Sequence, residues 1–361
     1  MPWDSPKNAF TRLLEEKRAA GARLIDLTLS NPTKAGIAYP GVEILDALRD
    51  ERALVYEPDP RGLRDAREAV AAEYGVSPDA VLLTASTSES YSLLFKMLCD
   101  PGDSILAPQP SYPLFDHLAA LEGVQIQPYP LERERDWQAG FPASTNARAI
   151  LAVSPNNPTG SWFGSKEDLS HVRRLGLPLI VDAVFAEYPF GVAPPPPRES
   201  RDLDVFTLGG LSKSAGLPQM KLGWILATGP GAHAALERLA AIADAYLSVS
   251  APVMRAAPRL LALAPRIRAR IAARTLANLD ALRASVGDRL LKPGGGWYAV
   301  VGPCAGRSDE TCALKLLRDD GTIVHPGYFF DFPVNGYLVV SLLAPEAEFR
   351  EGSARLASHL L

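Results

Sequence analysis

The middle of the chain alternates short apolar runs with stretches of helical pattern, and this order limits the possible folds more than any other feature. Several runs lack polar alternation, as expected for strands buried on both faces. The order predicts an α/β fold in which helices cover a largely parallel sheet. The runs are 81–85, 104–108, 149–154, 178–184, 204–211 and 221–227, and the helical patterns among them are 62–74, 88–99 and 165–175.

Prolines set two further expectations. Residues 231–284 are rich in Ala, Leu and Arg and predict a long helical stretch, broken near Pro252 and Pro258 because proline removes a backbone donor. The unbroken run from Pro194 to Pro197 excludes a helix or a central strand there. It predicts a surface loop over 189–200.

The C-terminal part has a different pattern from the middle. Short strand patterns alternate there with helical patterns, which is typical of a small α+β unit. We therefore expect a large domain over residues 40–255 and a smaller domain formed by residues 1–39 and 256–361 together. The strand patterns are 297–301 and 337–343, and the helical patterns are 309–318 and 346–360.

Composition limits the class of protein. The chain has 361 residues, 47% of them hydrophobic, and a formal net charge of −4, so neither nucleic acid nor a membrane is an expected partner. The sequence contains no run of eighteen apolar residues and no basic segment followed by an apolar one at its start, which predicts neither a membrane span nor a secretory signal. Three irregularly spaced cysteines, Cys99, Cys304 and Cys312, fit a reduced cytoplasmic protein.

Polar residues stand at the ends of five apolar runs. The carboxyl ends of parallel strands meet at one edge of a sheet, where ligands bind. We therefore expect these residues to form one site. They are Ser86-Thr87-Ser88, Pro110-Ser111-Tyr112-Pro113, Asn156-Asn157 with Thr159, Asp182, and Ser212-Lys213.

Three of these positions have both a functional and a structural interpretation. Lys213 lies among small and apolar residues, where a desolvated amine has a lowered pKa and becomes a nucleophile; otherwise it is a surface charge. Asp182 ends a very apolar run and either pairs with a cation or caps the structure. Ser86 with Glu89 fits a capping box, and the same helix start would bind a phosphate.

Four segments together resemble the class I/II aminotransferases, which are pyridoxal 5′-phosphate (PLP) enzymes of fold type I in the aspartate aminotransferase superfamily. The segments read LCDPGDSILAPQPSYPLF, VSPNNPTGSW, VDAVFAEY and LSKSAGLPQMKLGW. The resemblance extends over nearly the whole chain. It implies a seven-stranded, mainly parallel sheet between helices, with a smaller α+β domain. It also implies an enzyme that moves an amino group from an amino acid or amine to a carbonyl acceptor.

The resemblance assigns roles to residues of the expected site. Lys213 would bind the cofactor as a Schiff base and then move the proton. Asp182 would pair with the pyridine nitrogen, Asn157 would donate to the phenolate oxygen, and Tyr112 would stack on the ring.

The phosphate of the cofactor would be held by Ser86, Thr87 and Ser88. Tyr56 matches a tyrosine that reaches the phosphate of the neighbouring subunit in this family. The resemblance therefore implies a homodimer with shared sites.

The cofactor site departs from the family pattern at three positions. Lys221 stands where an arginine usually grips the phosphate, and lysine lacks the bidentate fork of arginine. Gly210, three residues before Lys213, stands where the family has a serine, and Ser212 would compensate for this loss. Phe185 replaces a tyrosine that donates to the phenolate oxygen, so we expect the Schiff base to have a raised pKa.

The substrate site departs from the pattern more severely. Val339, with Val340 as the next candidate, stands where an arginine usually binds the α-carboxylate of the substrate. Lys34 and Arg61 are candidate replacement cations, and a substrate without an α-carboxylate is the other explanation. Surface placement is the alternative interpretation for both cations.

Other residues are weaker candidates for substrate contact. His325 lies in a segment that the family places near the active site, although a structural histidine is equally expected. Tyr39, Trp162, Trp297 and Tyr328 would line an aromatic pocket or belong to the core.

Three functions remain open from the sequence. The first is an aminotransferase, and the second is a lyase, decarboxylase or cyclase on the same scaffold, which the missing arginine favours. The third is the sensor half of a transcription regulator. It is disfavoured because about forty residues precede the resemblance, too few for a DNA-binding domain.

Overall fold

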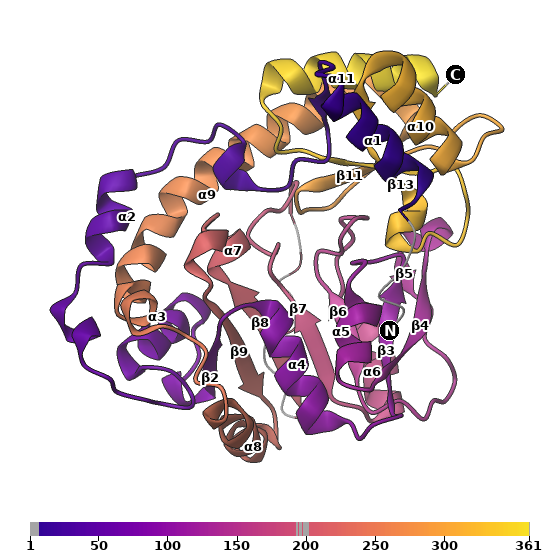
Figure 1. The fold of residues 1–361 in the computed structure, drawn as a ribbon. Coiled ribbons are helices and arrows are strands. Elements are labelled where there is room, and N and C mark those ends of the chain that lie inside the picture. The colour runs from indigo at the N-terminus through magenta and orange to yellow at the C-terminus, as the bar shows by residue number, and fades with distance from the viewer. Residues whose placement is uncertain (1–6, 193, 195–196, 198–201, 361) are drawn as a thin grey trace.

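The computed structural model describes residues 7–192, 194, 197 and 202–360, and its largest sheet has the predicted α/β architecture (Figure 1). The strand order is β2-β9-β8-β7-β6-β3-β4-β5. Strands β8, β7, β6, β3 and β4 are parallel, whereas β9 is antiparallel to both β2 and β8. The strands are β2 (Val81–Thr84), β3 (Ser104–Gln109), β4 (Gln125–Glu132), β5 (Gln138–Ala139), β6 (Ile150–Val153), β7 (Leu179–Asp182), β8 (Val205–Gly210) and β9 (Gly223–Thr228).

The sheet has eight strands where seven were expected. The additional strand, β5, has two residues and pairs antiparallel with the end of β4 at the sheet edge. A segment this short has no periodic pattern to reveal it. The predominantly parallel sheet itself is confirmed.

The central strands are apolar throughout because helices cover both faces of the sheet. In β6, Leu151 and Val153 pack on the face covered by α4 (Thr87–Leu98), α5 (Phe115–Leu121) and α8 (Ala232–Asp244). Ile150 and Ala152 point to the opposite face, where α6 (Lys166–Leu175) packs. Farther along that second face, α2 (Gly41–Ala47), α3 (Arg64–Tyr74) and α9 (Ala251–Val286) cover the other strands.

The predicted break near Pro258 is wrong. The chain leaves the helical conformation between α8 and α9, and Pro252 lies in the first turn of α9, where a missing N–H costs little. Pro258 and Pro265 both lie inside α9, which is continuous for 36 residues. The helix keeps an apolar stripe against α3 and α11, and this packing outweighs the lost hydrogen bonds (Figure 1).

A second group of elements lies at the other end of α9. The antiparallel strands β10 (Leu290–Leu291), β11 (Tyr298–Val301), β14 (Leu338–Ser341) and β13 (His325–Pro326) form one sheet in that order. Strand β1 (Ile25–Asp26) pairs with β12 (Thr322–Ile323). The helices of this group are α1 (Ala9–Ala19), α10 (Asp309–Asp320) and α11 (Glu346–His359).

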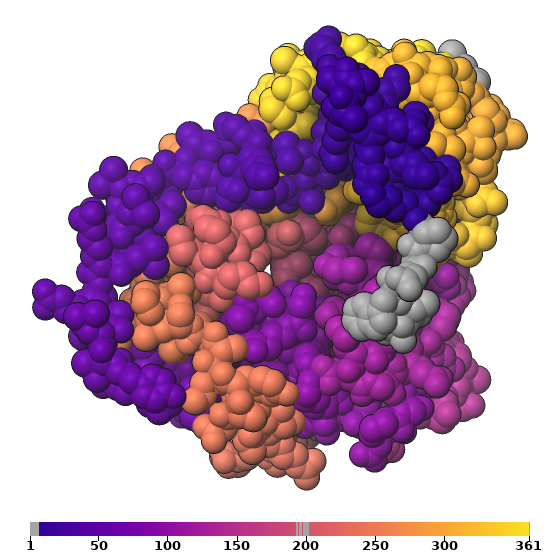
Figure 2. All heavy atoms as spheres, viewed as in Figure 1, coloured from indigo at the N-terminus to yellow at the C-terminus, as the bar shows by residue number. Residues whose placement is uncertain are grey.

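The N-terminal segment packs against the C-terminal one, as expected. Phe10, Ile25 and Leu27 share a buried cluster with Leu316 and Phe349. Figure 2 shows the indigo N-terminal atoms lying against the yellow and orange C-terminal ones.

Two other expectations concern the loop over 189–200 and the absence of a membrane span. Within the predicted loop 189–200, the residues that the structure describes form neither helix nor strand, apart from a bridge between Pro189 and Gly295, and the rest lie outside the described residues. No helix in the described part of the chain is long and apolar enough to cross a bilayer.

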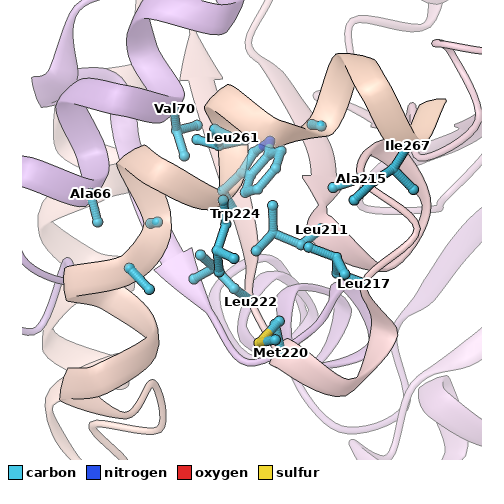
Figure 3. Packing of buried hydrophobic residues seen from close by; sticks show 14 of the residues in the cluster. Ala66, Val70, Leu211, Ala215, Leu217, Met220, Leu222, Trp224, Leu261 and Ile267 are labelled. Atoms are coloured by element: carbon cyan, nitrogen blue, oxygen red, sulfur yellow. The ribbon is translucent and has the colours of Figure 1, made fainter. Parts of the chain in front are cut away.

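The second sheet face is packed around Trp224 of β9. Figure 3 shows its indole surrounded by Val70, Leu211, Leu222 and Leu261. The indole also covers Gly209, its cross-strand partner in β8. A side chain at Gly209 would meet the indole, because an added Cβ would lie 2.3 Å from Nε1 of Trp224.

We expect Gly209→Ala to destabilise the protein by about 2 kcal/mol, because the new methyl group overpacks a closed core. Urea unfolding of the cofactor-free protein measures the change. Gly41→Ala is the matched control, since no atom lies within 4 Å of an added Cβ there and the position begins α2. Equal unfolding midpoints for both variants would contradict the packing argument.

Candidate active site

A cavity of about 360 Å³ opens at the carboxyl ends of the parallel strands. Its wall includes ten of the eleven residues predicted from the sequence for the cofactor site. The strand order explains this convergence, because each residue follows the carboxyl end of a strand or precedes the antiparallel β9. The ten are Ser86, Thr87, Ser88, Tyr112, Asn157, Asp182, Phe185, Ser212, Lys213 and Lys221.

Lys213 lies in the short helix α7 (Leu211–Ser214), directly after β8. Its Nζ atom is 5.7 Å from the centre of the Phe185 ring and 5.2 Å from that of Trp297. Burial lowers the pKa of Lys213, and the charge of Asp182 opposes this shift. The amine is therefore more available as a nucleophile than an exposed lysine.

Asp182 ends β7 and is only 7% exposed. The Tyr91 hydroxyl donates to its Oδ2 atom at 2.5 Å, and the Val184 amide donates to Oδ1 at 3.0 Å. Burial raises the pKa of Asp182, while these donors and Lys213 lower it. Asp182 is thus a fixed carboxylate that still lacks a close cationic partner among the described residues.

The two adjacent asparagines after β6 have different surroundings. Asn156 is satisfied within the protein, since it accepts from the Ser111 hydroxyl at 2.7 Å and donates to Pro110 and Thr159. Asn157 lines the cavity, and its buried Oδ1 has no hydrogen-bond partner among the described residues. Asn156 is therefore structural, whereas the amide of Asn157 is available to a ligand.

The start of α4 combines a helix cap with an anion site. Ser86 Oγ accepts from the Glu89 amide at 3.3 Å, and the Glu89 carboxylate accepts from the Ala85 amide at 2.5 Å. The predicted cap is therefore present, but the Glu89 carboxylate accepts from the amide of Ala85 and not from that of Ser86. Thr87 and Ser88 are the first two residues of α4, so their amides have no partner within the helix, and both residues line the cavity.

Lys221 approaches the same cavity from the start of β9. It is exposed and has the left-handed conformation, with φ of 48°, which is uncommon for a residue other than glycine. Ser212 and Lys221 add a hydroxyl and a positive charge to the anion site at α4.

Sequence reasoning missed three polar residues at this site. Tyr298 and Ser30 both line the cavity. Tyr91 holds Asp182 from α4. Only Tyr91 carried a signal, because it lies three positions after Ser88 on the same helix.

The position of the missing arginine is apolar in three dimensions. Val339 is fully buried in a cluster with Val300, Phe330 and Tyr337. The two candidate replacement cations lie outside the cavity wall: Lys34 is exposed, and Arg61 forms an ion pair with Glu237.

The weaker candidates for substrate contact are not among the described residues that line the cavity. His325 is paired with Val339 in the sheet, and burial lowers the pKa of His325 to about 4. Tyr39 and Trp162 donate to backbone carbonyls of Gly216 and Gly294, and Tyr328 packs on Phe329. Trp297 lies behind Lys213.

Tyr56 is the one predicted cofactor residue away from the cavity. It is 79% exposed and lines a separate groove with Glu89, Tyr246 and Met254.

The cavity suits an aromatic cofactor that carries both an aldehyde and a phosphate. A buried amine can bond the aldehyde, a carboxylate can pair with a ring nitrogen, and the unpartnered Asn157 amide can bond a ring substituent. The start of α4 suits the phosphate. In the described part of the chain, no cluster of His, Cys, Asp or Glu could hold a metal ion. These properties define a PLP-dependent enzyme of fold type I.

Comparison with known proteins narrows the class. The sequence model of aminotransferase class I and II matches residues 26–355. The chain therefore belongs to this family and is a PLP-dependent aminotransferase.

Individual relatives agree with this assignment. The chain is 27% identical to glutamate-pyruvate aminotransferase AlaA of Haemophilus influenzae, over 96% of this chain and 92% of that protein. It is 31% identical to nicotianamine aminotransferase 1 of Oryza sativa, but that match spans only 57% of this chain and 45% of the relative. The fold resembles that of alanine aminotransferase from Pyrococcus furiosus, with a TM-score of 0.85, 24% identity and coverage of 97% and 95%.

The lowered pKa of Lys213 predicts a distinctive chemical reactivity. In the cofactor-free protein, we expect acetylation of Lys213 to rise with pH around a midpoint below that of an ordinary lysine. Asp182→Asn should move the midpoint further down, because it removes the negative charge that stabilises the ammonium form.

Mass spectrometry of peptides labelled at a series of pH values measures both midpoints. The exposed Lys34 in the same sample corrects for the reagent. An ordinary lysine midpoint for Lys213, or an upward move in Asp182→Asn, would show that burial does not control this amine.

Proposed function

We propose that Lys213, Asp182 and Asn157 hold the reacting end of PLP and that Lys213 performs the proton transfers of transamination. The observation that carries the proposal is the meeting, in one cavity, of a buried amine, a buried carboxylate and the Asn157 amide, whose buried oxygen has no hydrogen-bond partner among the described residues. Asp182 would hold a proton at the pyridine nitrogen. Tyr91 and Val184 each occupy one of its oxygens and so fix its orientation. When bound, PLP supplies the conjugated ring that stabilises negative charge at the substrate carbon.

Proton movement falls to Lys213 Nζ. With PLP and substrate bound, the Lys213 Nζ atom would accept the proton from the substrate carbon and return it as general acid. Burial lowers the pKa of Lys213, which favours the neutral amine that can accept a proton. Phe185 and Tyr298 line this side of the cavity with aromatic surface, and the buried Trp297 ring packs behind them, which limits access of water.

The phosphate would lie at the start of α4. Ser86, Thr87 and Ser88 supply hydroxyls and free helical amides, and the helix dipole favours an anion there. Ser212 and Lys221, which line the same cavity, would add a hydroxyl and a positive charge to this site. Tyr112 is 5.5 Å from Phe115, centre to centre, and this contact positions its ring to stack on the cofactor.

Two lysines in one cavity allow a matched test of these roles. We expect Lys213→Ala to lower the rate of amino transfer by more than about 10³-fold, because it removes the group that moves the proton. Lys221→Ala should weaken PLP binding by about tenfold but keep turnover when PLP is saturating. Absorption spectra follow the lysine-bound cofactor, its conversion by an amino donor, and its return with a carbonyl acceptor.

Retained amino transfer in Lys213→Ala would contradict the assignment. Consumption of the amino donor without formation of the aminated cofactor would indicate the lyase, decarboxylase or cyclase reaction instead.

We also propose a homodimer with shared sites. Large apolar side chains are exposed along one segment of the described chain, and contiguous surfaces of this kind usually mark an interface. Tyr56 lies in this segment, so a second copy packed there would bring it toward another cavity. The exposed residues are Val42, Leu45, Leu54, Val55 and Tyr56.

If Tyr56 reaches the phosphate of the partner subunit, Tyr56→Phe should weaken PLP binding by about tenfold through loss of one charge-assisted hydrogen bond. Tyr328→Phe, at another exposed tyrosine, should leave binding unchanged. Equilibrium titration with PLP measures the affinity, and light scattering measures the molar mass. A monomeric protein, or unchanged affinity in Tyr56→Phe, would count against shared sites.

The domain division and the cellular location are proposals too. A separate buried cluster of residues 10–27 and 279–360 supports the smaller domain, although the boundary near residue 255 falls inside α9. The free cysteines Cys99, Cys304 and Cys312 are consistent with a cytoplasmic protein.

A further inference from the structure

The charges on the cavity wall are few. Among the described residues that line the cavity, only Asp182, Lys213 and Lys221 are ionisable to a full charge near neutral pH. The proposed function uses Asp182 and Lys213 at the reacting end of the cofactor and Lys221 at its phosphate. The part of the wall left for the substrate therefore holds no cation among the residues that the structure describes.

The wall beside Lys213 is aromatic. The Phe185 and Tyr298 rings line it with their centres 6.1 Å apart, and the buried Trp297 ring packs behind Phe185 with its centre 5.3 Å away. Ser30 lines the same cavity and adds a second neutral hydroxyl to that of Tyr298. A substrate group that points here meets ring surface and two neutral hydroxyls.

The layer behind Tyr298 is apolar as well. Tyr298, Val300 and Val339 lie on one face of the small sheet, since Val300 is paired with Val339 and alternate residues share a face. Phe330 and Tyr337 bury this face, and Val339 has no exposed surface. A side chain from beyond the sheet cannot reach the cavity through this layer.

Nearby arginines are held elsewhere. Arg268 donates to Glu187, Glu73 and the Ser214 carbonyl. Arg274 donates to the carbonyls of Ala35, Leu343 and Ala344.

Arg133 is at the outer edge of the apolar cluster, where it donates to the Tyr337 hydroxyl at 2.6 Å and stacks on that ring. These contacts hold it outside the cavity wall.

From this wall we infer that the carbon bearing the transferred nitrogen carries neutral groups, not a carboxylate, in the substrates of this enzyme. The inference rests on the proposed function of the cavity. A carboxylate placed against the aromatic wall would lose its hydration without gaining a counter-charge, and such burial is costly. A hydrogen, an alkyl or aryl group, or a carboxamide has no such cost.

The same restriction applies to both halves of the reaction, because donor and acceptor bind at the same cofactor. A primary amine R₂CH–NH₂ and a carbonyl compound R′₂C=O exchange to give R₂C=O and R′₂CH–NH₂, with no external oxidant or reductant. The donor class is therefore neutral primary amines or amino acid amides. The acceptor class is aldehydes and ketones rather than 2-oxo acids.

Binding and reaction can be measured separately on the PLP-loaded enzyme. 2-Methylalanine and its amide have no hydrogen on the amine-bearing carbon, so each binds without transamination and perturbs the absorption of the lysine-bound cofactor. We expect the amide to bind about 100-fold more tightly than the acid. Two reactive pairs, alanine with alaninamide and tyrosine with tyramine, should show the same order in the rate of cofactor conversion.

Equal or tighter binding of 2-methylalanine than of its amide would overturn the inference. Lys34→Ala and Arg133→Ala would then show whether either cation causes the preference for the acid. If both variants kept this preference, a residue of a second subunit would be indicated. If Lys213 binds PLP but no reactive donor is converted, transamination fails as the proposed function. The binding constants of the two unreactive analogues still decide the charge preference in that case.

Discussion

The burial of two opposite charges on adjacent strands is the constraint on which the cavity depends. Lys213 follows β8 and Asp182 ends β7, so the register of the parallel sheet brings both to one edge. Burial shifts the pKa of each toward its neutral form, and each opposes the shift of the other. Helices on both sheet faces maintain this desolvation. The cavity therefore offers a reactive amine and a fixed carboxylate that an exposed surface could not provide together.

Much of this arrangement was accessible from the sequence, and for a physical reason. Apolar strands of a parallel sheet end at a common edge, so polar residues that directly follow them must converge. Lys213, Asp182 and Asn157 could be placed in this way without knowing any distance. The helix start at Ser86 was likewise readable, because capping depends on neighbours within one turn.

Features that depend on distant contacts were not readable. Continuation of α9 through Pro258 and Pro265 results from packing against α3 and α11, which no local pattern contains. Strand β5 is too short to show a period. Tyr298 and Ser30 come together from positions 268 residues apart, so neither looks exceptional in its own segment.

The cofactor wall and the substrate wall come from different parts of the fold. Residues that suit PLP lie at strand ends of the large sheet, whereas Tyr298 belongs to the small sheet and Ser30 to the N-terminal segment. Val339 belongs to the small sheet, so an exchange between arginine and valine at this position would not touch Lys213, Asp182 or Asn157. The chemistry of the cofactor can therefore be kept while the charge of the substrate changes. Only the buried face behind Tyr298 must repack, which apolar side chains do at small cost.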